Sequence, residues 1–402
     1  AAHAEGADTL VCSSVIREDN PELAAARANG ARVLHRSEAL AALMTGRVGV
    51  TVAGTHGKTT TSSMIALMLR HAGAEPTFAI GAPIPQLGTN AELGAGPAFV
   101  AEADESDGSF LNYTPTIAVV TNVEADHLDH YGTAEKVHAA FDDYAQLLPD
   151  DGLLIACADD AGSAATAANY LASRQEARVV SYGFGEGSTV RLSRADHSGL
   201  ASTATVSLPG GESAQLRLQV PGNHNLLNAA AALAVGLELG LSAQAALDGL
   251  AAFGGAARRF DFRGSEGGVR VYDDYAHHPT EVTAALLAAR DVAGEGKVHV
   301  LFQPHLFTRT RDFAAEFGEA LSLADTVSLL PIYPAREEPI EGVSSELVAA
   351  SVTAPHAVVQ AADAAGFLAA KVAPGDVVMT VGAGDVTAQG ALILEAIAAR
   401  GL

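Results

Sequence analysis

Residues Val48–Thr60 read VGVTVAGTHGKTT, and this stretch decides the fold. Val48–Ala53 is almost entirely apolar and rich in valine, which predicts a buried strand. The apolar side chains between residues 64 and 69 predict a helix that stops near Gly73. A glycine-containing loop between such a strand and helix presents backbone N–H groups to a phosphate, and its glycines allow close approach. We therefore expect a phosphate-binding loop at Gly54–Thr60.

The side chains of this loop indicate a nucleotide. Lys58 is one of only four lysines, and its position suits the β- and γ-phosphates. Thr59 has the hydroxyl position that binds Mg²⁺ in P-loops. The strict P-loop spacing is not met, because Val52 stands where the first glycine is expected. The alternative is a glycine-rich turn without a ligand, and the scarcity of lysine argues against it.

Strand-like and helix-like segments alternate along the chain, which predicts an α/β fold with parallel sheets. Residues 189–220 instead alternate between apolar and polar and contain Gly-Gly and Pro-Gly turns, which predicts antiparallel hairpins. Gly254–Ala257 indicates a linker or hinge before a separate α/β part. The other expected strands span residues 9–13, 32–34, 99–101, 117–121, 269–272, 297–302, 326–330 and 377–381.

Two polar clusters follow neighbouring strands in the first α/β part. Glu102, with Asp104, Glu105 and Asp107, comes after strand 99–101, and carboxylates this close repel each other unless a cation is present. A solvated loop is the alternative. The second cluster, residues 122–130, contains His127 among several acids, which predicts a second metal ligand or a structural histidine.

Three more polar segments, residues 273–281, 304–311 and 382–385, follow strands of the C-terminal part. Ligands of α/β sheets collect at the carboxyl ends of strands. We therefore expect these segments to form one site, although the last of them alone would be an ordinary glycine-rich turn.

Composition excludes several classes of function. The chain has 402 residues, and 24 Lys and Arg against 47 Asp and Glu give a net charge of −23. Nucleic acid and anionic membrane surfaces are therefore not expected as partners. No apolar run reaches the roughly 18 residues that a membrane span needs. Two cysteines, Cys12 and Cys157, are too few for a disulfide framework and fit a reducing cytosol.

In this order, these motifs resemble the Mur ligases of bacterial cell-wall synthesis over nearly the whole chain. The carrying segments are GTHGKTT at Gly54, AEADESD at Ala101, TNVEADHLDHY at Thr121, PGNHNLLNAAAA at Pro221, RRFD at Arg258, DDYAHHPTE at Asp273 and QPHLFTRTRD at Gln303. The last two favour the member that adds L-alanine over those that add later residues.

The resemblance implies an α/β fold of Mur ligase architecture. Residues 1–46 would be the C-terminal part of a Rossmann-like domain for the UDP-sugar. Residues 47–257 would be a central P-loop ATPase domain with an added antiparallel portion, and residues 258–402 a Rossmann-like domain for the amino acid. The resemblance also implies a bacterial cytoplasmic enzyme, monomeric or homodimeric, that joins L-alanine to UDP-N-acetylmuramic acid through an acyl phosphate and releases ADP and phosphate.

The resemblance further assigns roles to residues. The nucleotide would be bound by Gly54, Thr55, His56, Gly57, Lys58, Thr59, Thr60, Asn225, Asn228, Arg259 and Asp274. Mg²⁺, or Mn²⁺ in its place, would be bound by Thr59, Glu102 and His127. The substrates would meet Ser13, Ser14, Tyr275, His277, His305 and Arg309. Catalysis would rest on Lys58, His127, His277 and Arg309.

Two departures from the family pattern stand out. Leu306 occupies a position that is basic in many relatives, which leaves Arg309 or Arg311 for the alanine carboxylate. The glycine-rich fingerprint of the first domain is absent, so we expect a truncated or partial chain with impaired UDP-sugar binding. The alternatives are a tripeptide-recycling or polyglutamate ligase of the same superfamily, and an ATP-binding module without ligase activity.

Overall fold

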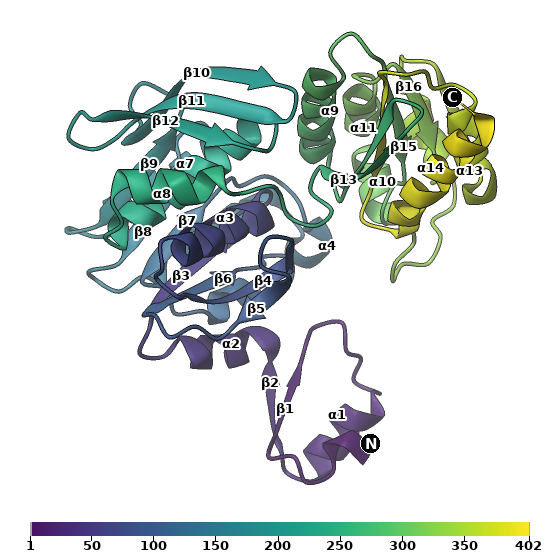
Figure 1. The fold of residues 1–402 in the computed structure, drawn as a ribbon. Helices are drawn as coiled ribbons and strands as arrows, with labels where there is room; N and C mark the ends of the chain where they lie inside the picture. The colour runs from purple at the N-terminus through teal and green to yellow at the C-terminus, as the bar shows by residue number, and fades with distance from the viewer. Residues whose placement is uncertain (1, 402) are drawn as a thin grey trace.

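A computed structural model describes residues 2–401, with residue 129 described by its backbone alone, and Figure 1 shows three parts along the chain. The first part is a parallel pair of strands flanked by helices, in which Thr9 pairs with Arg32. Its first long helix begins at Pro21 because the side chain of Asn20 accepts hydrogen bonds from two free backbone N–H groups. The elements are η1 (Ala2–Ala4), β1 (Thr9–Cys12), α1 (Pro21–Ala28), β2 (Arg32–His35) and α2 (Arg36–Met44).

The central part is built on one ten-stranded sheet, in the order β12-β11-β10-β9-β8-β7-β3-β6-β4-β5. In this spatial order, all neighbouring strands from β10 through β9, β8, β7, β3 and β6 to β4 run parallel. At one end of the sheet β10, β11 and β12 pair antiparallel, and at the other end β5 pairs antiparallel with β4. The strands are β3 (Val48–Ala53), β4 (Thr77–Ile84), β5 (Thr89–Glu92), β6 (Ala98–Glu102), β7 (Ile117–Val120), β8 (Leu153–Cys157), β9 (Arg178–Gly183), β10 (Val190–Ser198), β11 (Ala201–Ser207) and β12 (Ser213–Leu218).

Helices cover both faces of this sheet. On one face α3 (Lys58–His71), α7 (Asn223–Glu238) and α8 (Ala243–Ala251) share one apolar core, and at Gly249 a Cβ would lie 2.8 Å from the Met68 Cα. This glycine therefore sets how closely two helices approach. The other face carries η2 (Ser109–Asn112), α4 (Leu128–Tyr131), α5 (Ala134–Gln146) and α6 (Ala161–Ser173), with their own core.

The C-terminal part has a six-stranded sheet in the order β13-β14-β18-β15-β16-β17, parallel except for β13. Separate apolar cores lie on its two faces. The strands are β13 (Asp261–Glu266), β14 (Val269–Asp274), β15 (Val298–Phe302), β16 (Thr326–Leu329), β17 (His356–Val358) and β18 (Val377–Val381). The helices are α9 (Pro279–Ala293), α10 (Phe307–Asp312), α11 (Ala314–Leu321), α12 (Ser345–Ala349), α13 (Ala361–Ala369), η3 (Asp385–Ala388) and α14 (Gln389–Arg400).

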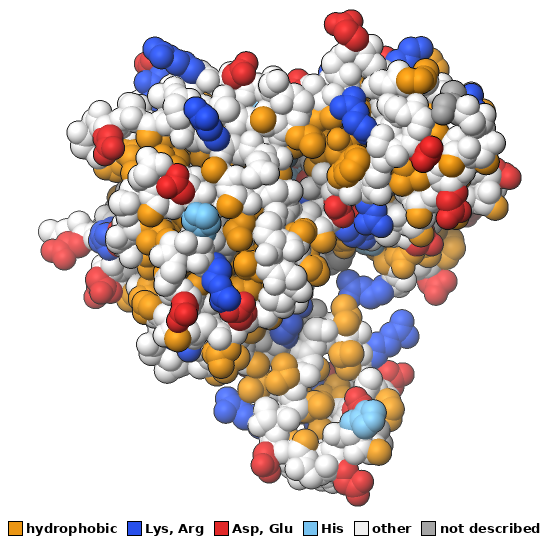
Figure 2. All heavy atoms as spheres, viewed as in Figure 1, with side chains coloured by type: hydrophobic (Ala, Val, Ile, Leu, Met, Phe, Trp, Pro, Cys, Tyr) orange, Lys and Arg blue, Asp and Glu red, His pale blue; other side chains and the backbone are white. Residues whose placement is uncertain are grey.

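The expected α/β class and the antiparallel portion are confirmed, with element ends shifted by a few residues. Six strands in the described part of the chain were not among the expected ones: β4, β5, β8, β9, β13 and β17. No helix among the described residues is long and apolar enough to cross a membrane. Acidic side chains are scattered over all three parts on the face shown in Figure 2, in line with the negative net charge.

Candidate active site

The loop between β3 and α3 is held in place by the residues that follow β7. The His56 backbone N–H donates to Asn122 Oδ1 at 2.7 Å, and Thr121 Oγ1 donates to the His56 carbonyl at 2.6 Å. Gly57 has a φ of 82°, and a Cβ there would lie 2.7 Å from Asn228 Oδ1. Only glycine fits this turn into α3, whose first N–H groups face an anion site.

Lys58 lies at the start of α3 and is nearly buried. Its Nζ donates to the carbonyls of Gly54 and Thr55, at 2.7 Å and 3.1 Å, and to the Glu105 carboxylate at 2.9 Å. Burial raises the pKa of Glu105 to about 7, although Lys58 opposes this. Burial alone would lower the pKa of Lys58, but Glu105, Asp104 and Glu102 together outweigh it and the pKa is raised, so the ammonium stays charged.

Two of the three expected metal ligands are in direct contact. Thr59 Oγ1 donates to Glu102 Oε1 at 3.0 Å, and Glu102 Oε2 accepts from the Gly81 N–H at 2.8 Å. His127 lies farther along, with Nε2 3.6 Å from Glu105 Oε1, and its backbone is left-handed with a φ of 54°. Burial lowers the pKa of His127, which favours the neutral imidazole that binds metals. A hydroxyl and a carboxylate beside a phosphate loop fit Mg²⁺.

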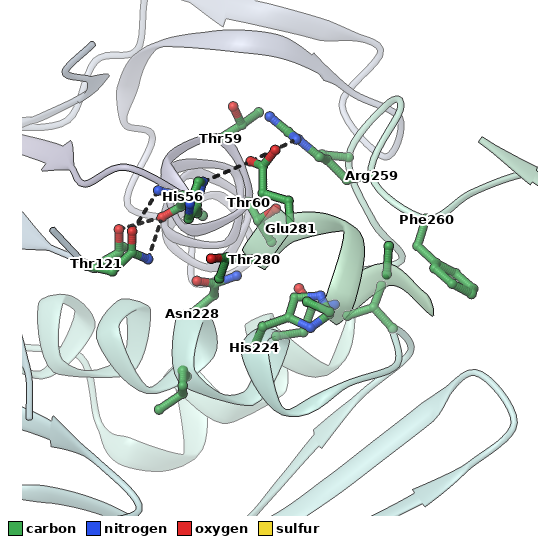
Figure 3. A pocket seen from close by; sticks show the side chains of 18 of the residues that line it. His56, Thr59, Thr60, Thr121, His224, Asn228, Arg259, Phe260, Thr280 and Glu281 are labelled. Atoms are coloured by element: carbon green, nitrogen blue, oxygen red, sulfur yellow. Dashed lines mark hydrogen bonds and ion pairs between the residues drawn. The ribbon is translucent and has the colours of Figure 1, made fainter. Parts of the chain in front are cut away.

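Two cavities adjoin this loop, with volumes of about 310 Å³ and 480 Å³, in the range of small-molecule sites. Figure 3 shows the first, with His56 and Glu281 pointing toward one another and Arg259 beyond. All of the C-terminal and α7 residues expected to contact nucleotide line this cavity: Asn225, Asn228, Arg259 and Asp274. Burial raises the pKa of Asp274 to about 6, and its carboxylate accepts the Phe260 and Ala276 N–H groups.

The second cavity joins the expected metal ligands to the C-terminal part. Thr59, Glu102 and His127 line it together with Tyr275 and His277. The two cavities have five lining residues in common, His56, Gly57, Thr59, Arg259 and Glu281. A ligand in one cavity therefore lies directly beside a ligand in the other.

Arg309 does not extend freely into a cavity. Its Nη2 contacts Asp126 Oδ1 at 2.9 Å and Oδ2 at 3.2 Å, and both side chains are buried. Burial alone would raise the pKa of Asp126, but Arg309 and His127 hold it well below its usual range. The expectation left Arg309 or Arg311 for the alanine carboxylate, and the structure gives Arg309 a partner in the central part. A guanidinium has five N–H donors, so three remain beyond Nη2.

The histidines beside Arg309 are uncharged. Burial lowers the pKa of His277 to about 3 and that of His305 to about 4. Their ring centres lie 6.1 Å apart, and the Tyr275 ring lies 5.2 Å from His277. The structure thus brings together the C-terminal residues expected at the amino-acid site.

Ser13 and Ser14 lie outside both cavities, just after β1. Ser14 Oγ donates to Asp107 Oδ2 at 2.6 Å, and His35 Nε2 lies 3.6 Å from the same oxygen. Of the two expected sugar-nucleotide residues, Ser14 therefore contacts the acidic segment after β6.

Three carboxylates lie where the central and C-terminal parts meet, and none of them was assigned a role from the sequence. Asp126 pairs with Arg309, Glu124 accepts from Thr280 Oγ1 at 2.7 Å, and Glu281 lies 3.2 Å from His56 Nδ1. The one local signal was that Glu281, in the first turn of α9, follows His277 by four residues. The other pairs join distant segments, which sequence spacing does not reveal.

Three family models match the chain. The Mur ligase family catalytic domain matches residues 1–47, the Mur ligase middle domain residues 52–236, and the Mur ligase glutamate ligase domain residues 258–384. The chain is 60% identical over 391 residues to UDP-N-acetylmuramate–L-alanine ligase of Paenarthrobacter aurescens, covering 97% of this chain and 84% of that relative.

Solved structures agree with these matches. UDP-N-acetylmuramate–alanine ligase MurC of Thermotoga maritima is 28% identical, with a TM-score of 0.80 over 98% of this chain and 86% of that one. MurF ligase of Thermotoga maritima, solved in complex with ADP, is similar in fold, with 20% identity and a TM-score of 0.74 over 98% of this chain and 96% of that one.

Proposed function

The chain belongs to the UDP-N-acetylmuramate–L-alanine ligases of the Mur ligase family, and from this membership we propose how its residues carry out the reaction. The activity is the ATP-dependent joining of L-alanine to UDP-N-acetylmuramate in peptidoglycan precursor synthesis. A carboxylate is a poor acylating agent, so phosphorylation by ATP supplies the leaving group. The alanine amine then attacks the acyl phosphate, and ADP and phosphate are released.

The phosphate step rests on the loop and Lys58. Phosphoryl transfer needs positioning and charge neutralisation more than a protein nucleophile. The Lys58 ammonium would exchange the carbonyl and carboxylate contacts that it now makes for contacts with the phosphates. The backbone N–H groups of Gly57–Thr60 would bind the same phosphates. Asn225, Asn228, Arg259 and Asp274 would hold the rest of the nucleotide in the cavity that they line.

The metal would be held by Thr59 and Glu102, which already touch, with His127 at a second position. When bound, Mg²⁺ supplies positive charge to the phosphate oxygens. The donor sets differ in character, because the first offers oxygens and the second a neutral imidazole nitrogen. The first set is therefore the more selective for Mg²⁺, and Mn²⁺ suits both.

We place L-alanine at Arg309, with Tyr275, His277 and His305 around it. Arg309 uses Nη2 for Asp126, which fixes the guanidinium while its remaining donors are available to a carboxylate. Neutral His277 and His305 do not repel the alanine ammonium. We assign Ser13 and Ser14 to the UDP-sugar, and the domains to residues 1–46, 47–257 and 258–402, which agrees with the three separate sheets.

One observation carries this proposal: the phosphate loop, the metal ligands and two of the expected amino-acid residues, Tyr275 and His277, line two adjoining cavities with common walls. The test is ATP-dependent phosphate release with UDP-N-acetylmuramate and a panel of L-alanine, glycine, L-serine, D-alanine, L-glutamate and a tripeptide. We expect L-alanine to give the highest kcat/KM. Preference for glutamate or the tripeptide would indicate another amide ligase, and ATP binding without release would indicate a binding module.

A further inference from the structure

A second cluster of metal-ligating side chains lies on the junction of the central and C-terminal parts. It consists of His56 in the phosphate loop, Glu124 after β7, and His278 just before α9. One ligand atom from each of the three residues lies within 4.8 Å of the other two. None of these side chains belongs to the oxygen-rich set formed by Thr59 and Glu102.

The distances suit one tetrahedral ion. His56 Nε2 lies 3.5 Å from Glu124 Oε2, and His278 Nδ1 lies 3.7 Å from the same oxygen. In a tetrahedral zinc site with bonds of about 2.1 Å, neighbouring ligand atoms lie about 3.4 Å apart. The distance between His56 Nε2 and Glu124 Oε2 is at the outer limit of a hydrogen bond, and the distance between His278 Nδ1 and Glu124 Oε2 is beyond that limit.

The partners of these side chains also point to a missing ligand. Among the described residues, Nε2 of His56 is buried without a hydrogen-bond partner, and the His56 side chain is nine-tenths buried. Buried polar atoms are rarely left unpaired. His278 Nδ1 accepts only a long contact, 3.4 Å, from the Thr280 N–H.

The outer contacts are those that metal-bound histidines use. The Nδ1 of His56 lies 3.2 Å from Glu281 Oε1, which is the carboxylate–histidine arrangement that orients a ring whose other nitrogen binds a metal. Glu124 Oε2 is in turn held by Thr280 Oγ1 at 2.7 Å. Burial alone would lower the pKa of His56, but Glu281 and Glu124 raise it to about 9, so the site already attracts a positive charge.

We propose that His56, Glu124 and His278 form a binding site for a divalent transition-metal ion of the Zn²⁺ class. Two imidazoles and one carboxylate favour Zn²⁺ over Mg²⁺. The ion binds Nε2 of His56, displaces the proton there, and leaves its fourth position to water. Because His56 and Glu124 come from the central part and His278 from the C-terminal part, the ion links the two parts beside the nucleotide cavity, which His56 and Glu124 line.

The test is Zn²⁺ binding to the whole chain without nucleotide, measured by competition with a chromophoric chelator. The variants are Glu124→Gln and His278→Gln, with His356→Gln, an exposed histidine elsewhere, as matched control. We expect one equivalent of Zn²⁺ to bind the unaltered chain and the control. At least a tenfold loss of affinity is expected in both site variants, and circular dichroism checks their folding.

Co²⁺ serves as a spectroscopic probe, and we expect the intense visible bands of a tetrahedral ion, weakened in the site variants. Glu102→Gln separates the two metal sites, because it removes a ligand from the magnesium set alone. Equal Zn²⁺ affinity in Glu124→Gln, His278→Gln and the control would overturn the proposal. So would a Zn²⁺ equivalent that is lost only in Glu102→Gln. Neither outcome bears on ligase activity, which the phosphate-release assay measures separately.

Discussion

The buried ion pair between Arg309 and Asp126 connects the C-terminal part to the central part, and Asp126→Asn tests its role. The two residues are 183 positions apart in the sequence, and their side chains are only 7% and 5% exposed. Asparagine keeps the shape and one acceptor oxygen but removes the charge. The Arg309 guanidinium then stays buried without a counter-ion.

The magnitude follows from this burial. Removing one partner of a buried pair costs about 3–5 kcal/mol, and we take the lower end because the amide oxygen still accepts a hydrogen bond. The cost falls on the closed arrangement of the two parts, because separating them would return Arg309 to water. A cost of about 3 kcal/mol corresponds to roughly a hundredfold loss in kcat/KM for L-alanine.

The assay is a double-mutant cycle of Asp126→Asn and Arg309→Met, read as kcat/KM from phosphate release. We expect Asp126→Asn to cost far less in the Arg309→Met background, with a coupling of about 2 kcal/mol or more. Asp150→Asn, at a fully exposed carboxylate, is the matched control. Activity of Asp126→Asn within threefold of the unaltered chain, or coupling below about 0.5 kcal/mol, would refute the reasoning.

The pair should not contribute to the pH profile near neutrality. The folded-state pKa of Asp126 is lowered, so its stabilisation is present above the unfolded value of about 3.9 and is lost only as the pH falls below it. A change in the pH profile between pH 6 and 8 in Asp126→Asn would contradict this assignment.

Four further predictions concern the phosphate loop and His127. Lys58→Ala should abolish phosphate release, because phosphate charge goes uncompensated and Glu105 loses its partner; near-normal turnover would contradict the assignment. His127→Ala should raise the Mg²⁺ concentration for half-maximal rate more than the KM for ATP, and an unchanged Mg²⁺ titration would count against a metal role. Gly57→Ala should weaken ATP binding at least tenfold, because its Cβ would lie 2.7 Å from Asn228 Oδ1. Gly210→Ala is the control, since it has similar backbone strain at a φ of 94° but open space around it, and equal ATP affinity in both variants would refute the steric argument. Finally, the pKa of His56 is raised to about 9 in the folded chain. The contribution of His56 to the stability of the fold is therefore full below the pKa of about 6.5 in the unfolded chain, and it declines as the pH rises through 9. The unfolding temperature should therefore fall between pH 7 and 9.5, and less so in His56→Gln; parallel curves would exclude this role.

The phosphate loop was predictable because all of its determinants are local. An apolar strand, a left-handed glycine and a lysine at a helix start lie within Val48–Thr60, and the structure has β3, Gly57 and α3 at these positions. The hairpin of β4 and β5 was missed, since β5 (Thr89–Glu92) is short and mostly polar and depends on pairing with β4. Glu281 was visible only as a residue four positions after His277.

The sequence by itself determined the alternation of strands and helices, the antiparallel portion, the nucleotide loop and the family, because periodicity and motifs act over a few residues. Only the tertiary structure decided which side chains meet across the junction. The contacts of Arg309 with Asp126, and of His56 with Glu281 and Glu124, depend on how two sheets and their helices pack. The spacing of these residues along the sequence does not reveal the distances between their side chains. The charges of these residues were therefore readable in the sequence, but their partners were not.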